Sequence, residues 1–227
     1  MDIIAQERSF SESIAAKKGP SSDKVNKSFS KLKIGVLALQ GAFAKHCEMI
    51  TKLGASSILV KKPEDLLKID ALIIPGGEST TMLHQIRFIN LFPALHDFAR
   101  HKPIFGTCAG LILMSNQKST VHKDDSLEAL DVVVERNAFG RQVESFKANL
   151  EVMLPASKSF SYPAIFIRAP RIKQIGPKVT ILSAYEGEPV LIQQGIHMAS
   201  SFHPELTDDL RIHSYFLSQV EKSKNGN

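Results

Sequence analysis

The 227-residue sequence has no Trp, only two Cys, and no uninterrupted apolar run longer than four residues. A transmembrane helix needs about 20 apolar residues and a secretory signal about 7 to 15, so we expect neither. Two cysteines are too few for a disulfide framework or a Cys-rich zinc site. We therefore expect a cytoplasmic protein in a reducing compartment, with no membrane association and no bound metal.

An excess of one charge sign is also nearly absent. The 28 Lys and Arg residues against 23 Asp and Glu give a net charge of +5, and residues 1–33 alone carry +3 of it, from seven basic and four acidic side chains. Proteins that bind nucleic acid gather basic side chains on one face or helix. The isoelectric point near 9.1 therefore comes largely from the N-terminal segment, and we expect no nucleic-acid partner.

Residues 1–30 differ in composition from the rest of the chain. They are rich in Ser, Lys and Ala and lack a strand-like apolar run, which is typical of a disordered extension. The alternative is a short docking helix with Ile3, Phe10 and Ile14 on one face. A mitochondrial transit peptide is disfavoured because the segment is not poor in acidic residues.

Residues 31–222 are predicted to form a single domain, followed by a flexible tail at 223–227. Its first half alternates short apolar runs with amphipathic stretches of helical length. We predict strands at 32–39, 58–60, 71–74 and 103–105, and helices at 42–53, 79–90, 94–100 and from 109. This alternation is typical of βαβ units, so it predicts an α/β fold in which a mainly parallel sheet is flanked by helices in three layers.

Beyond residue 130 the apolar runs follow one another more closely. We predict strands at 132–134, 146–154, 164–167, 179–184, 190–193 and 196–202. These strands are expected to extend the same sheet in antiparallel directions. A closing helix is predicted to begin at Thr207, because Thr is a favourable N-cap and Asp208 and Asp209 would lie in the positive first turn.

Residues 106–110, with the sequence GTCAG, connect a predicted buried strand to a helix. Two glycines around a nucleophile permit a sharp turn that lifts the middle side chain out of the sheet. The helix-terminal amides would favour a thiolate at Cys108. These five residues alone leave a second interpretation equally open, in which Cys108 packs in an apolar turn. Cys47 follows Phe43 by four residues on the apolar side of a helix, and we interpret it as a core residue.

A thiol nucleophile needs a general base, and the base needs a group that orients it. His203 follows a predicted apolar strand and opens the sequence His203-Pro204-Glu205. Because Pro204 fixes its own φ angle, the Glu205 carboxylate can reach one imidazole nitrogen while the other faces the thiol. A loop His beside a solvated Glu is the common alternative for such a pair taken alone.

A Gly-rich segment at residues 75–81, PGGESTT, lies after a predicted strand and before a helix. Paired glycines bring backbone N–H groups close to a ligand, as oxyanion stabilisation in acyl transfer requires. Phosphate binding is the alternative, since Gly-rich turns at helix N-termini hold anions. Neither of the common Gly-rich phosphate motifs is present, so we predict an oxyanion loop.

Together the three segments resemble the class I, or triad, glutamine amidotransferases, which have a flavodoxin-like three-layer fold. Residues 35–41 (GVLALQG), 135–142 (ERNAFGRQ) and 166–170 (FIRAP) narrow this resemblance to the glutaminase subunits of pyridoxal 5'-phosphate synthase. The resemblance covers residues 32–220. In this family Ala38 stands where many relatives have Gly, and residues 118–126 look like a variation in an exposed loop.

The resemblance implies the roles of the catalytic residues. Cys108 would attack the side-chain amide of L-glutamine to give a γ-glutamyl thioester that water hydrolyses. His203 would protonate the departing ammonia and then activate the water, and Glu205 would hold the His203 tautomer. The backbone N–H groups of Gly77 and Ala109 would stabilise the oxyanion.

The resemblance also implies which residues hold the amino-acid end of glutamine. They are Gly77, Glu78, Ser79, Arg136, Ile167 and Arg168. An Arg suits this task because its guanidinium can bind a carboxylate through two hydrogen bonds. Surface cations are the alternative for the two arginines, and the role of Arg141 is less secure and could be structural.

The family passes its ammonia to a synthase subunit, which is the expected partner, and it needs no cofactor. Gln40 and His46 match the surface that faces this partner. The family's glutaminase is nearly inactive alone, and Gly76 and Gly77 would permit a peptide flip in the oxyanion loop when the partner docks.

Two other functions stay open on the residues alone. One is an amidotransferase subunit of another pathway or a free-standing γ-glutamyl hydrolase, which the arginine-containing segments disfavour. The other is a non-catalytic partner protein that senses oxidants through Cys108, which an intact His203 and Glu205 pair disfavours, because a sensor needs no general base.

Overall fold

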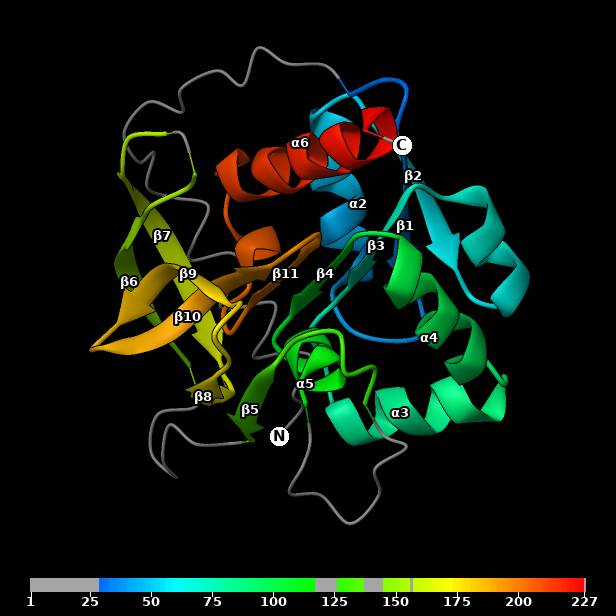
Figure 1. Ribbon diagram of the computed structural model, residues 1–227, viewed down its shortest axis with the longest axis horizontal. Helices are drawn as coiled ribbons and strands as arrows, with labels where there is room; N and C mark the ends of the chain where they lie inside the picture. Colours follow the sequence, from blue (N-terminus) through cyan, green and yellow to red (C-terminus); the bar gives the residue numbers. More distant parts are fainter. Residues whose placement is uncertain (1–28, 117–125, 137–144, 156, 227) are drawn as a thin grey trace, which may run out of the picture.

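The computed structural model describes residues 29–116, 126–136, 145–155 and 157–226 (Figure 1). Its strands are β1 (Lys33–Leu37), β2 (Ser56–Val60), β3 (Ala71–Ile74), β4 (Ile104–Thr107), β5 (Val132–Glu135), β6 (Ser145–Val152), β7 (Phe160–Ile167), β8 (Arg171–Ile175), β9 (Thr180–Tyr185), β10 (Glu188–Gln194) and β11 (His197–Ser200). Its helices are α2 (Phe43–Lys52), η1 (Pro63–Lys68), α3 (Ser79–Phe88), α4 (Phe92–His101), α5 (Ala109–Met114), η3 (Pro204–Leu206) and α6 (Arg211–Asn225), where η marks a 3-10 helix.

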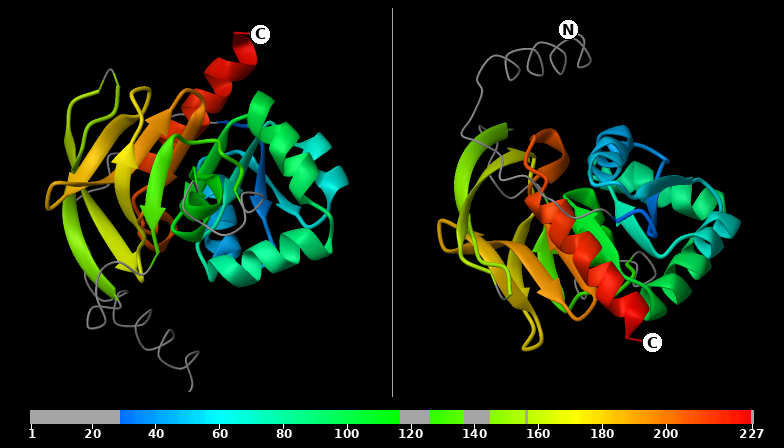
Figure 2. Two further views of the ribbon diagram at one scale, coloured as in Figure 1. Left: turned by 60° about the horizontal axis from the view of Figure 1, so that its bottom comes forward. Right: turned by 90° about the horizontal axis from the view of Figure 1, so that it is seen from above.

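The central sheet has seven strands in the order β2-β1-β3-β4-β11-β10-β9. The first five strands in this order, β2, β1, β3, β4 and β11, run parallel to one another. β10 pairs with β11 in antiparallel orientation, and β9 pairs with β10 in the same way. β3 is buried on both faces: Ile73 packs in the cluster that includes α2 and α6, and Leu72 and Ile74 pack in the cluster that includes α3, α4 and α5. The predicted α/β fold with helices on both faces of a mainly parallel sheet is confirmed (Figure 2).

Four strands of the C-terminal half do not join the central sheet, contrary to the prediction. β5 pairs with β8, and β6 pairs with β7, as two separate antiparallel pairs. The hairpin of β6 and β7 places Leu150, Tyr162 and Phe166 in the core cluster that includes α6, and the intervening side chains of β6 are exposed or half-buried. A hairpin with one apolar face covers a core better than it extends a sheet that is buried on both faces. The sequence RIKQI does not predict β8, because it is mostly polar.

The N-terminal boundary of the domain lies earlier than the sequence predicts. Phe29, which the prediction assigns to the extension, is 1% exposed in the core. Its N–H donates to the carbonyl of Leu53 at 3.2 Å. Residues 1–28, which include the alternative docking helix, lie outside the described residues, as do residues 118–125 of the predicted loop variation.

The last helix begins at Arg211, four residues after the predicted start. The Thr207 hydroxyl lies 3.1 Å from the Tyr162 hydroxyl and 3.2 Å from the Pro204 carbonyl oxygen, so it stabilises the preceding turn. The Asp209 carboxylate instead accepts a hydrogen bond from the Arg211 N–H at 3.0 Å. α6 continues to Asn225 and so includes the first residues of the predicted tail.

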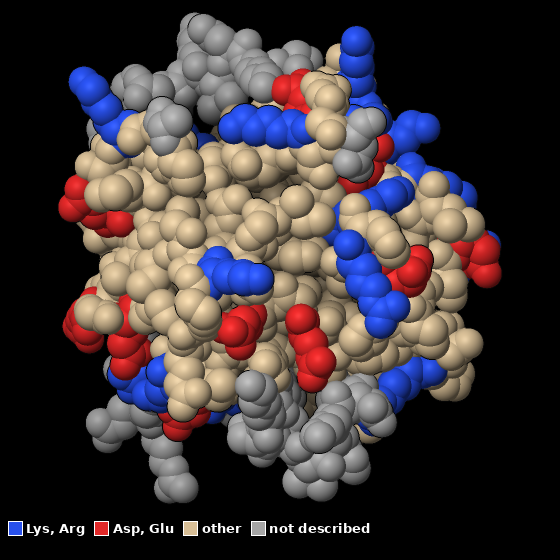
Figure 3. All heavy atoms as spheres, viewed as in Figure 1, with Lys and Arg blue, Asp and Glu red and all other residues tan. Residues whose placement is uncertain are grey.

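Charged side chains of both signs are interspersed on the face seen in Figure 3, and basic residues do not gather there into one patch. Each helix of the described residues is too short or too polar to cross a membrane.

Candidate active site

The three predicted catalytic segments meet at one edge of the central sheet. The oxyanion loop follows β3, Cys108 follows β4, and His203 lies shortly after β11. These strands are adjacent and parallel, so their carboxyl ends lie at the same edge, which is where open α/β sheets bind ligands. The fold therefore brings together segments that are far apart in the sequence.

Cys108 lies at a strained turn between β4 and α5. Its φ and ψ angles are 49° and −102°, a backbone conformation that costs a residue other than Gly about 1–3 kcal/mol. Gly110 is required beside it, because a Cβ there would lie 2.2 Å from the backbone oxygen of Ile74. The predicted sharp turn is present, and it presents Cys108 at the wall of a cavity.

His203 and Glu205 form a buried pair beside this cysteine. The Nδ1 atom of His203 lies 2.7 Å from the Oε1 atom of Glu205, and the two residues are 7% and 2% exposed. The Cys108 side chain interacts with His203 as well, and this interaction raises the pKa of the His203 imidazole. Cys108, His203 and Glu205 therefore follow one another in the order that nucleophilic catalysis requires.

The electrostatics of the pair favour charge on both members. Burial opposes a charge on His203, but the negative Glu205 and the hydrogen bond with Cys108 outweigh it and raise the pKa of His203 to about 10. Burial likewise opposes charge on Glu205, but His46 and His203 lower the pKa of its carboxyl to about 2.

The oxyanion loop is held from two sides. The N–H of Gly76 donates to the Oγ1 atom of Thr107 at 3.0 Å, and Gly77 has a φ of 152°. The Gln40 side chain accepts from the N–H of Glu78 at 3.2 Å and donates to its carbonyl oxygen at 2.5 Å. Gln40 is half-buried and contacts the loop. The sequence analysis predicted only that Gln40 faces the partner, and it did not predict this contact.

Glu78 has a structural role that the sequence analysis missed. Its carboxylate caps α3 by accepting hydrogen bonds from the N–H groups of Thr80 and Thr81 at 2.9 and 2.6 Å. The Thr81 hydroxyl and these two N–H groups lower the pKa of Glu78 to about 2. Glu is not among the usual N-cap residues, which is why the sequence pattern did not indicate this cap.

A cavity of about 950 Å³ covers the catalytic residues. Its lining includes all of the residues predicted to bind glutamine, namely Gly77, Glu78, Ser79, Arg136, Ile167 and Arg168. The Ile167 carbonyl oxygen lies 3.8 Å from the Cys108 sulfur. Arg168, at the end of β7, has a φ of 42°, and such strain in a residue other than Gly is concentrated at functional sites.

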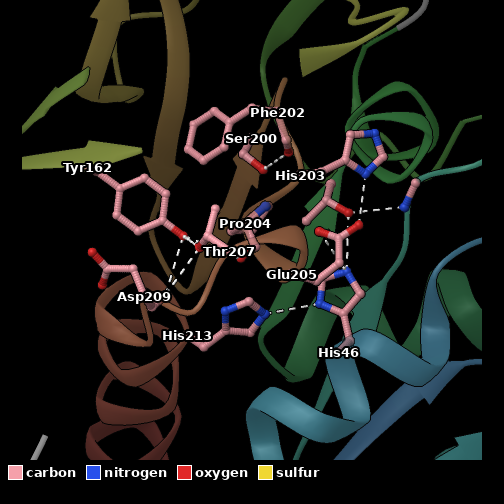
Figure 4. Close-up of polar contacts among 12 residues, drawn as sticks. His46, Tyr162, Ser200, Phe202, His203, Pro204, Glu205, Thr207, Asp209 and His213 are labelled. Atoms are coloured by element: carbon pink, nitrogen blue, oxygen red, sulfur yellow. Dashed lines mark hydrogen bonds and ion pairs between the residues drawn. The ribbon is translucent and has the colours of Figure 1, made fainter. Parts of the chain in front are cut away.

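His46 does not lie at the surface, and its predicted role as a partner-facing residue is wrong. Its side chain is fully buried, with Nε2 3.4 Å from the Oε2 atom of Glu205. Figure 4 shows His46 and His203 approaching this carboxylate from different sides. The spacing of Phe43, His46 and Ile50 on one helix face is the signal that could have indicated its burial.

Two further residues of this cluster were not indicated by the sequence pattern. Thr107 supports the oxyanion loop as described, and His213 of α6 contacts His46 with its Nε2 atom 3.0 Å from His46 Nδ1. Cys47 is half-buried and packs against the core, as its interpretation as a core residue predicts. Among the described residues, no group of three or more His, Cys, Asp and Glu is arranged to hold a metal ion.

The profile of the SNO glutamine amidotransferase family matches residues 36–222. The chain belongs to this family. Two relatives are named pyridoxal 5'-phosphate synthase subunit PdxT. The one from Shouchella clausii is 52% identical over 190 residues, covering 83% of this chain and 95% of the relative. The one from Thermotoga neapolitana is 49% identical over 191 residues, covering 84% of this chain and 100% of the relative.

Two solved structures have a similar fold. A crystal structure described as a glutamine amidotransferase superposes with a TM-score of 0.76 at 43% identity, covering 83% of this chain and 98% of that chain. A Thermoplasma acidophilum protein described as part of a putative GMP synthase superposes with a TM-score of 0.63 at 16% identity, covering 86% and 96%. The second likeness shows the fold alone.

Proposed function

We propose that this chain is the glutaminase subunit of a pyridoxal 5'-phosphate synthase, which hydrolyses L-glutamine to L-glutamate and ammonia for vitamin B6 synthesis. The observation that carries the proposal is the buried line of Cys108, His203 and Glu205 at the wall of the cavity. The names of the half-identical relatives support the pathway. The free cysteine of the proposed nucleophile suits a reducing compartment, so we propose that the reaction takes place in the cytoplasm.

Catalysis begins with attack of the Cys108 thiolate on the side-chain carbonyl carbon of glutamine. The tetrahedral intermediate collapses when His203 donates its proton to the departing nitrogen, and ammonia leaves a γ-glutamyl thioester behind. His203 then takes a proton from water, which attacks the thioester and releases glutamate. Glu205 holds the Nδ1–H of His203 throughout, so that Nε2 faces the reacting atoms.

The oxyanion of this intermediate is stabilised by backbone N–H groups. We assign the donors to Ala109, the first residue of α5, and to Gly77, which lines the cavity together with Cys108. A single donor of this kind contributes about 10²- to 10³-fold to the rate. The Gly76 N–H is not available for this role, because Thr107 holds it on the inner side of the loop.

The amino-acid end of glutamine binds to other residues that line the same cavity. Arg136 and Arg168 bind the substrate carboxylate, and the Ile167 carbonyl oxygen and the Glu78 carboxylate accept from its ammonium group. Ser79 contributes a hydroxyl from the first turn of α3. The cavity arrangement supports this assignment, since all five residues line the same cavity as Cys108.

The Arg136→Ala variant is expected to raise the KM for glutamine about 10- to 100-fold, because a charge-assisted hydrogen bond contributes about 1.5–3 kcal/mol. Its melting temperature should stay close to that of the wild type. Arg171→Ala is the matched control, because Arg171 pairs with Glu188 between strands and should affect stability rather than KM. Steady-state kinetics and thermal denaturation of both variants distinguish these outcomes, and the reverse pattern would make Arg136 a structural residue.

The activity should persist to unusually high pH. His203 must be protonated to give its proton to the departing nitrogen, and a pKa of about 10 keeps it protonated below that pH. The value of kcat at saturating glutamine is therefore expected to fall only as the pH rises through about 10, rather than through the ordinary His value of about 6.5. A profile measured between pH 6 and 11 with the synthase subunit present tests this, and a falling limb near pH 6.5 would contradict it.

The partner that we propose is the synthase subunit, which receives the ammonia. The cavity extends from Cys108 along α2, where Lys45, Glu48 and Lys52 line it, and this opening gives the partner a surface to cover. Gln40, which precedes α2, links this region to the oxyanion loop.

Ammonia release is expected to be weak from the isolated chain and to rise strongly when a synthase subunit is added. Co-purification with candidate synthase subunits, combined with an assay of glutamate and ammonia, tests the proposed function. Full activity of the isolated chain, with no gain from any synthase subunit, would instead indicate a free-standing γ-glutamyl hydrolase.

A further inference from the structure

A second histidine contacts the carboxylate of the proposed triad. His203 lies 2.7 Å from the Oε1 atom of Glu205, and His46 lies 3.4 Å from the Oε2 atom of the same carboxylate. The side chains of His46 and Glu205 have no exposed surface. Among the described residues, Oε2 accepts no hydrogen bond of normal geometry, so the approach of His46 is the contact that faces this buried negative oxygen.

A third histidine, His213, contacts the ring nitrogen of His46 that faces away from Glu205. His213 of α6 is 1% exposed, and its Nε2 atom lies 3.0 Å from the Nδ1 atom of His46. The Nδ1 atom of His213 is buried without a hydrogen-bond partner in the described part of the chain. The four side chains therefore form one continuous series of contacts, from His213 through His46 and Glu205 to His203 (Figure 4).

The charges in this series of contacts determine which ring nitrogens of His46 and His213 carry a proton. Burial lowers the pKa of His46 below its ordinary value and the pKa of His213 to about 3, so each ring is neutral and carries one proton. If the proton of His46 were on Nδ1, its Nε2 lone pair would face the negative Glu205. His213 would then carry its proton on Nδ1, where the described residues provide no acceptor, and a buried donor without a partner is costly.

The opposite arrangement has neither penalty. The Nε2–H of His213 donates to Nδ1 of His46, and the Nε2–H of His46 points toward Oε2 of Glu205. The same Nε2 atom lies 3.4 Å from the Thr107 hydroxyl, which supports the oxyanion loop through Gly76. The groups that face His46 are thus Glu205, His203, His213 and Thr107.

We propose that His46 is a positioning residue of the glutaminase, which directs an Nε2–H at the second oxygen of Glu205, and that His213 fixes the His46 tautomer. This inference rests on the proposed function. A buried carboxylate with one oxygen unpaired would rotate or take up a proton, and either change would release the His203 ring from its orientation. His46 prevents both without touching substrate, so its effect is on kcat rather than on glutamine binding.

Two substitutions of His46 separate the hydrogen bond from packing. In His46→Leu, which removes the donor, kcat measured with the synthase subunit should fall about 10- to 100-fold, as expected when a catalytic group is misplaced. The KM for glutamine should change by no more than about twofold. In His46→Gln, the amide can place an N–H near the position of Nε2, and kcat should return to within about threefold of the wild type.

Ile50→Ala is the matched control for loss of packing. Ile50 lies one turn further along the same face of α2 and is fully buried, but it belongs to the apolar core. Its truncation should lower the midpoint of urea denaturation with kcat unchanged. An equal loss of kcat in His46→Leu and His46→Gln, or wild-type kcat in His46→Leu, would overturn the proposal.

A measurement on the unmodified chain covers the case in which these variants do not fold. Nitrogen NMR of the chain with ¹⁵N-labelled histidine reports which ring nitrogen carries the proton. We expect the Nε2–H tautomer for both His46 and His213, and an Nδ1–H tautomer at His46 would overturn the proposal. Failure of the proposed function is a separate outcome: wild-type chain with synthase subunit would then release no ammonia, whatever the tautomer.

Discussion

The Cys108→Ala variant is expected to lose glutaminase activity almost completely, with kcat falling by at least about 10⁵-fold even when the synthase subunit is present. Covalent catalysis has no substitute for its nucleophile. The strained turn remains in the variant, because Ala at this position keeps the Cβ atom and removes only the sulfur. The loss should therefore occur without a loss of stability or of partner binding, which thermal denaturation and co-purification measure.

Cys47→Ala provides the control for this result. Cys47 is half-buried on α2 and packs against the core, away from the cavity lining. We expect this variant to retain the activity of the wild type. Retention of activity by Cys108→Ala, or loss in Cys47→Ala alone, would remove Cys108 from the role of nucleophile.

The Gly110→Ala variant should be severely destabilised. A Cβ at this position would lie 2.2 Å from the backbone oxygen of Ile74, and β3 cannot move away because it is paired on both sides, with β1 and β4. Such overpacking costs about 3 kcal/mol or more, since a backbone atom cannot change rotamer to make room. Urea denaturation measures this loss, and activity should be lost with it because α5 carries the turn at Cys108.

Gly195 provides a control that separates the effect of a steric clash from the effect of losing a backbone conformation that glycine favours. Gly195 has a φ of 56° and nothing within 4 Å of a Cβ built on it, so Gly195→Ala should cost only about 1–2 kcal/mol. If Gly110→Ala were as stable as Gly195→Ala, the close approach of α5 to β3 would not be a constraint on this site.

The sequence predicted the parts of the site that depend on local pattern. An apolar run followed by glycines or by His-Pro-Glu indicates the end of a strand. Because the carboxyl ends of parallel strands lie at the same edge of the sheet, the proximity of Cys108 and His203 could be predicted. The α/β class followed from the same alternation of elements. These features are set by periodicity and turn chemistry within short segments.

Features that depend on packing between distant segments were not predicted. His46 and His213 are 167 residues apart in the chain, and no local pattern indicates that two helices bring them together. The same reason explains β8, whose polar sequence forms a strand only because β5 is there to pair with it. Glu78 is a third example. The sequence analysis predicted that it binds the ligand, but not that its carboxylate caps α3.

The measurement that tests the central claim most directly is covalent labelling by a glutamine analogue with a diazoketone in place of its side-chain amide. Such an analogue alkylates the nucleophile that attacks the amide carbon. With the chain and synthase subunit together, peptide mass spectrometry should locate the label on Cys108, excess L-glutamine should prevent it, and activity should fall in proportion. Labelling at Cys47 instead, or inactivation with Cys108 unmodified, would contradict the account.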